Sequence, residues 1–115
     1  MYMFSYADVN ADVHSGARLQ EQVAFTQVID LLALAKDMDV GARASIDALF
    51  MLRRLWSALI EDLASDDNDL PPQLRADLIS IGLWVLKESE RIRQGQSDNF
   101  AGLIEVNSII RDGLK

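Results

Sequence analysis

Apolar residues recur at intervals of three and four along most of this chain, which is the spacing of one face of an α-helix. The first such pattern runs from Leu19 to Ala33 and is widened by neighbouring apolar residues. Ser15 is a candidate N-cap for it. Gly41 follows a polar break and can adopt the left-handed conformation that ends many helices. The pattern therefore predicts a first helix from Ser15 to the segment before Gly41.

The second pattern predicts a central helix from residues 42–45 to about Ala64. Three further leucines widen its apolar surface beyond one stripe, which indicates burial on two sides. The residues expected on its main face are Ile46, Leu49, Phe50, Arg53, Trp56, Ile60 and Leu63.

A polar turn at residues 65–69 separates this helix from a third one. Pro71 and Pro72 suit the first turn of a helix, where a missing backbone N–H costs nothing. We predict that the third helix runs from about Pro72 to Gln94 and is ended by Gly95. Its expected buried line is Leu74, Leu78, Ile81, Gly82, Val85 and Ile92.

Gly82 lies in the middle of the third predicted helix. A glycine there costs about 1 kcal/mol relative to alanine. It therefore marks either a close helix crossing or a gap of ligand size, and the crossing is the favoured interpretation.

Candidate caps at residues 97–99 precede a fourth predicted helix. Asn107 interrupts its apolar line, and a buried amide needs hydrogen-bond partners. Asn107 therefore either caps a neighbouring element or faces a partner chain. The other residues expected on this face are Phe100, Leu103, Ile104, Ile110 and Leu114.

Together these patterns predict an all-α fold with about four helices in an irregular or partly antiparallel bundle. Residues 1–14 lack sustained helical spacing and form a predicted N-terminal arm, and residues 15–115 form a single domain. The aromatic residues of the arm either pack on the domain or meet a partner. The first three helices alone would close a core.

Composition narrows the range of functions. The 115 residues carry a formal charge of −7, with a pI near 4.5. This charge disfavours direct nucleic-acid binding, which depends on lysine and arginine. The chain has no cysteine and no apolar stretch long enough to cross a bilayer. We expect a soluble protein of the cytoplasm without membrane insertion.

The sequence offers little for reaction chemistry. His14 and Ser15 are adjacent, but neighbours in sequence do not form a catalytic pair, which must face each other in space. Residues 66–69 lack the spacing, glycine and distal glutamate of a calcium loop and are expected to form a solvated turn. We therefore expect no catalysis, no metal site and no cofactor.

Four large side chains are candidates for partner binding. Arg53 and Trp56 share one face of the central helix, so Arg53 is either a side chain paired with a carboxylate or half of an interface anchor. Leu83 and Trp84 lie off the buried line of the third helix and either pack against the fourth helix or bind a partner helix. With Asn107, these are the predicted interaction residues.

Three segments carry a resemblance to a known family: residues 50–56, residues 70–86, and residues 102–107 with Ile110 and the Gly113–Leu114 pair. The chain resembles FlaF, the regulator of flagellin biosynthesis in alphaproteobacteria. The likeness is close over residues 41–115 and looser before them.

The resemblance implies a non-enzymatic cytoplasmic protein that supports flagellin production and filament assembly and opposes the repressor FlbT. It implies binding to flagellin, in the manner of a secretion chaperone. Two alternatives stay open at this point: regulation of flagellin messenger RNA through FlbT, and a homodimeric interaction module. The partner surface would include Arg53, Trp56, Leu83, Trp84 and Asn107, with Gly41, Pro71, Pro72 and Gly82 in structural roles.

Overall fold

The computed structural model describes residues 7–39 and 41–113, with side chains from Gln20 onward. It contains helices α1 (Ala7–Ala35), α2 (Arg43–Ala64), α3 (Pro72–Arg93) and α4 (Phe100–Gly113). The predicted all-α fold of four helices is confirmed. Every element in the described part of the chain is a helix or its connection.

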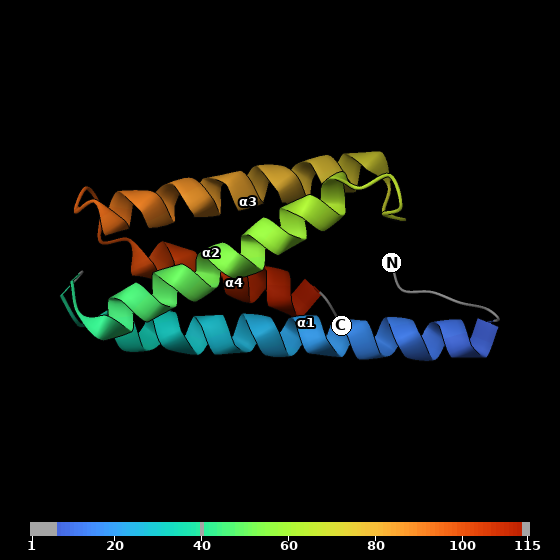
Figure 1. Ribbon diagram of the computed structural model, residues 1–115, viewed down its shortest axis with the longest axis horizontal. Coiled ribbons are helices and arrows are strands. Elements are labelled where there is room, and N and C mark those ends of the chain that lie inside the picture. Colours follow the sequence, from blue (N-terminus) through green and yellow to red (C-terminus); the bar gives the residue numbers. More distant parts are fainter. Residues whose placement is uncertain (1–6, 40, 114–115) are drawn as a thin grey trace.

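The four helices form an elongated bundle with principal extents of 50, 23 and 18 Å. Figure 1 shows α1 and α3 along opposite sides, α2 crossing diagonally between them, and α4 behind α2. α2 packs against both α1 and α3, α4 packs mainly against α1, and α3 has little contact with α4. The prediction that α2 is buried on two sides is therefore confirmed.

Helix α1 begins earlier than its sequence pattern indicated. The predicted start was Ser15, whereas the helix starts at Ala7, so residues 7–14 of the predicted arm are helical. Helix formation needs backbone hydrogen bonds but no apolar stripe, which explains why periodicity missed this part. The rest of the predicted arm, residues 1–6, lies outside the described residues.

The remaining helix boundaries agree closely with the pattern. α2 starts at Arg43 and ends at Ala64, and α3 starts with Pro72 in its first turn, after Pro71. α4 follows Asn99, whose side-chain oxygen accepts the backbone N–H of Gly102 at 3.0 Å and so caps the helix.

Gly95 lies two residues after the end of α3 and has a left-handed backbone conformation, with φ of 77°. The N–H of Gly95 bonds the carbonyl of Ile92 at 3.0 Å, and the N–H of Gln96 bonds that of Arg91 at 2.8 Å. These two bonds define a Schellman motif. Gly41 was predicted to cap the first helix. α1 ends earlier, at Ala35, and Val40, the residue before Gly41, lies outside the described residues.

The core is built mainly from α1 and α2, with Val85 and Ile92 contributed by α3 and Phe100 and Leu103 by α4. Phe25 of α1 meets Trp56 of α2 edge to face, with ring centroids 5.8 Å apart. Ser45 and Ala48 fill positions of α2 that were not assigned to the core by pattern. Ser45 and Ala48 have small side chains, so neighbouring helices can approach α2 closely on the side where these two residues lie.

Two predicted core faces are therefore only partly correct. On α2, Leu49, Trp56 and Leu63 are buried, whereas Ile46 and Phe50 are exposed. On α3, Leu74 is also exposed. The apolar pattern located the helices but did not fix their rotation about their own axes.

Candidate functional site

Trp56 and Asn107 lie inside the bundle rather than on its surface. Both side chains are almost completely buried, and the indole Nε1–H of Trp56 donates to Oδ1 of Asn107 at 2.7 Å. The Nδ2 of Asn107 donates in turn to the carbonyl of Leu103 at 2.7 Å. Asn107 was expected either to bond a neighbouring element or to face a partner chain. The structure shows the first, a hydrogen bond to Trp56 of α2.

Arg53 and Trp56 were predicted to share one face of the central helix, and the structure gives them different surroundings. The two residues are three positions apart on α2, which leaves them about 60° apart around the helix axis. Trp56 turns toward α3 and α4, while Arg53 stays exposed at the edge of the helix. Trp56 and Asn107 therefore connect α2 to α4 inside the bundle, whereas Arg53 is exposed.

Gly82 is the point where α3 meets the Trp56 ring. A methyl group placed on Gly82 would come within 2.6 Å of Cε3 of Trp56 and 2.9 Å of Cδ1 of Ile60. This geometry is the close crossing that the mid-helix glycine predicted, and the space is filled by the indole.

Leu83 and Trp84 follow directly on α3 and are exposed, at 56% and 40% of their maximum areas. They point away from the line of Gly82 and Val85 because neighbouring residues are rotated by about 100°. Both side chains are therefore exposed, in directions about 100° apart around α3, and neither is fully packed against α4.

The outer side of α2 carries a second set of exposed residues. Ile46, Phe50, Arg53 and Arg54 recur at helical spacing on one face, and all four are exposed. The guanidinium carbon of Arg54 lies 5.9 Å from the centre of the Phe50 ring, within cation–π range. Arg53 is close enough to α3 for its positive charge to help lower the pKa of Glu90, which is lowered mainly by hydrogen bonding to Arg93.

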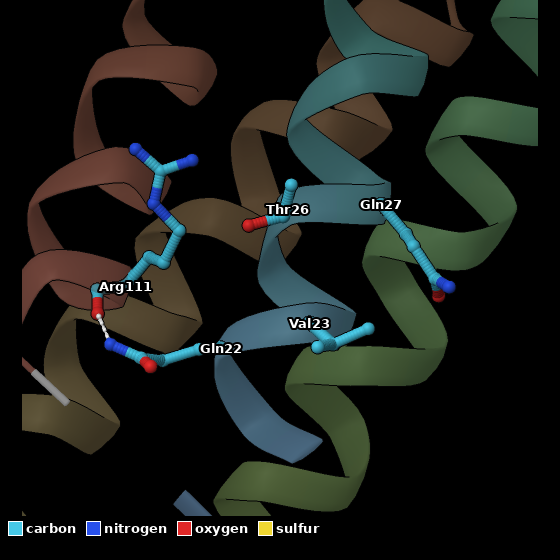
Figure 2. Close-up of a pocket in the computed structure, with 5 residues that line it drawn as sticks. All are labelled: Gln22, Val23, Thr26, Gln27 and Arg111. Carbon is cyan, nitrogen blue, oxygen red and sulfur yellow. Dashed lines mark hydrogen bonds between the residues drawn. The ribbon is translucent and has the colours of Figure 1, made fainter. Parts of the chain in front are cut away.

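An open hollow lies between α1 and α4 (Figure 2). Its volume is about 370 Å³, and its lining residues are Gln22, Val23, Thr26, Gln27 and Arg111. The Nε2 of Gln22 donates to the carbonyl of Arg111 at 3.4 Å, which ties α1 to the end of α4. Arg111 is in turn paired with Asp112 at 3.2 Å. This lining offers amides, a hydroxyl and one apolar side chain.

One buried polar group was missed by the sequence reasoning. Glu88 is 5% exposed, and its carboxylate accepts bonds from Ser97 and Arg91, each at 2.7 Å. The Ser97 hydroxyl lowers the pKa of Glu88 most, burial opposes this, and Arg91 lowers the pKa further. The spacing of Arg91 three residues after Glu88 was the available signal.

In residues 7–39 and 41–113, no group of three or more histidine, cysteine, aspartate or glutamate side chains is arranged to hold a metal ion. Within the same part of the chain, no helix has the length and apolar character needed to cross a membrane.

The fold and the exposed side chains define a small four-helix protein that presents apolar and arginine side chains on α2 and α3. The family of flagellar protein FlaF has a sequence model that matches residues 2–114, and the chain therefore belongs to this family. Comparisons with curated proteins and with solved structures gave no significant match.

Proposed function

We propose that this protein binds flagellin in the cytoplasm and supports its production, its delivery for export and its assembly into the filament. It acts by binding rather than by catalysis and opposes FlbT. Membership of the flagellar protein FlaF family supports a role in the flagellar system. Direct binding to flagellin is what we propose beyond family membership.

The observation that carries this proposal is the exposed pair Leu83 and Trp84 on α3. Tryptophan is enriched in interface hot spots, where its large ring becomes desolvated by a partner. Two large apolar side chains side by side on a helix suit an amphipathic partner helix. The terminal segments of flagellin are expected to be amphipathic helices that must be kept from assembling early.

The test is a calorimetric titration of purified flagellin into this protein, with the Trp84→Ala variant alongside. We expect binding at micromolar affinity or better, and weaker binding by Trp84→Ala because the indole is removed from the interface. Far-UV circular dichroism and the unfolding midpoint establish that the variant is folded. Ile109→Ala is the matched control, since Ile109 is an apolar residue on α4 that is 63% exposed.

Absence of binding with both proteins monodisperse would contradict the proposal. It would leave regulation through FlbT as the function to test next, beginning with a titration of FlbT itself.

A further inference from the structure

We propose that flagellin docks along the α2–α3 seam, through an amphipathic helix that carries carboxylates beside its apolar face. The seam surface consists of Ile46, Phe50, Arg53 and Arg54 on α2 together with Leu83 on α3. This inference rests on the proposed function and names both the surface used and the chemistry of the segment that binds.

The first step of the argument is the outer side of α2. Ile46 and Phe50 are four residues apart and are exposed at 54% and 57%. An amphipathic helix of a globular protein normally turns such residues toward the core. Here the core side of α2 is already filled by other residues, so two large apolar side chains are left on one outer stripe.

The second step joins this stripe to α3. α2 and α3 are in extensive contact. In Figure 1 they meet near the end of α2 and diverge toward its start. A methyl group on Gly82 of α3 would meet Trp56 and Ile60 of α2, so this part of α3 borders α2. The charge of Arg53 also makes a small contribution to lowering the pKa of Glu90. Leu83 lies seven residues before Glu90, or about two turns, and therefore on the same side of α3. Leu83 thus continues the apolar surface across the seam.

The third step is charge complementarity. The whole chain has a formal charge of −7, yet the seam surface carries two adjacent arginines. Arg54 lies against the face of the Phe50 ring. A guanidinium carries its N–H donors in its own plane, and they can bond a carboxylate in bidentate fashion.

These features specify the partner segment. An amphipathic helix would bind this surface through apolar residues at spacings of three, four and seven. The arginines select a segment with aspartate or glutamate next to that apolar line. A strongly basic segment would be repelled at this position and is excluded as the occupant.

The experiment is flagellin calorimetry with two seam variants and two matched controls. Phe50→Ala removes the apolar anchor, and Arg54→Glu reverses the charge beside it. Ile109→Ala removes an exposed apolar residue elsewhere, and Lys36→Glu makes the same charge change after the end of α1. We expect each seam variant to weaken binding about tenfold or more, and each control to change it less than about threefold.

A charge swap tests the chemistry of the partner. In flagellin, a glutamate or aspartate flanking the apolar face of a terminal helix is replaced by lysine. This change is expected to weaken binding to the unmodified protein and to restore binding to Arg54→Glu. Recovery of this kind requires that the two charges approach each other in the complex.

Three outcomes would overturn the seam proposal while leaving flagellin binding intact. The first is unchanged affinity in both seam variants. The second is a loss confined to Trp84→Ala, which would place the contact on the outer side of α3. The third is a homodimer that Phe50→Ala dissociates without changing flagellin affinity. Failure of the unmodified protein to bind flagellin at all would instead remove the proposed function.

Discussion

The bond between Trp56 and Asn107 is the most demanding interaction in the core at the scale of single residues. Both groups are removed from water, so each depends on the other for a hydrogen-bond partner. The side-chain amide also reaches the carbonyl of Leu103, so two bonds fix its orientation. An internal polar contact of this kind specifies how α2 and α4 are aligned.

Replacing Asn107 by leucine is expected to lower the free energy of unfolding by about 1–3 kcal/mol, because the indole N–H is left buried without its acceptor. Urea unfolding followed by circular dichroism measures this change. The cost should be smaller when Trp56→Phe is already present. An equal cost in both backgrounds would show that the hydrogen bond is not its source. Ile109→Ala, on the exposed side of the same helix, should stay within about 0.5 kcal/mol of the unmodified protein.

A second residue-scale prediction concerns Gly82. Alanine improves helix propensity by about 1 kcal/mol, but its methyl group would lie 2.6 Å from the Trp56 ring. The ring is buried and cannot move away cheaply, so we expect Gly82→Ala to lower stability by about 1–3 kcal/mol. Thermal and urea unfolding provide the measurement. Gly113→Ala is the control, since a methyl group there meets nothing within 4 Å. Stabilisation by Gly82→Ala would mean that α3 shifts freely on α2.

At the scale of elements, the connection between α3 and α4 is held by side chains rather than by packing of the two helices. Glu88 bonds Ser97 in the connection and Arg91 on its own helix, and Asn99 caps α4. Because α3 and α4 have little other contact, Glu88 sets where α4 leaves the end of α3.

This cluster predicts a dependence of stability on acidity. The pKa of Glu88 is lower in the folded protein than its usual value of 4.5. The stabilisation is therefore complete above the unfolded pKa and is lost as the pH falls through the folded pKa. Glu88→Gln should lower stability near neutral pH and flatten the fall in stability on the acidic side of 4.5. Urea midpoints across that range give the comparison, and identical acid profiles would contradict a role for the carboxylate.

The elements also show what a sequence pattern can and cannot predict. Pro72, Asn99 and Gly95 act at helix ends through local backbone chemistry, and all three were recognised from sequence. The rotation of α2 was not, because Phe50 and Leu52 are equally apolar. In the structure Ser45 and Ala48 are fully buried, although neither was assigned to the core from the pattern.

In the candidate site, too, some features could be recognised from sequence and others depended on the fold. The sequence placed Leu83 and Trp84 off the buried line of α3 but left open whether they pack on the fourth helix or meet a partner, and the structure leaves both exposed. Asn107 was recognised as unusual, but only the fold could supply Trp56 as its partner, 51 residues away. Phe50 was assigned to the core, and its stacking with Arg54 was invisible to periodicity. Sequence patterns describe single helices, whereas a surface depends on which of their faces remain uncovered.

At the scale of the whole molecule, the bundle consists of two packed pairs, α1 with α4 and α2 with α3, which α2 joins by also packing on α1. The first and last described helices are therefore neighbours in space (Figure 1). Phe100, Leu103 and Asn107 are all buried, so α4 completes the core around Trp56.

Removing residues 98–115 is expected to abolish cooperative thermal unfolding. Three helices were expected from sequence to suffice for a core, but without α4 the indole of Trp56 loses its acceptor and part of its apolar cover. Circular dichroism on heating and tryptophan fluorescence report this. A sharp transition with unchanged fluorescence would show that α1, α2 and α3 form a stable unit.

The pairing of α1 with α4 also has a consequence for the order of events on the ribosome. Translation runs from the N-terminus, so α1, α2 and α3 are made before α4. Trp56 therefore has no internal acceptor until Asn107, 51 residues later, has been made. The packing of α4 on α1 and the bond from Trp56 can form only at this later stage.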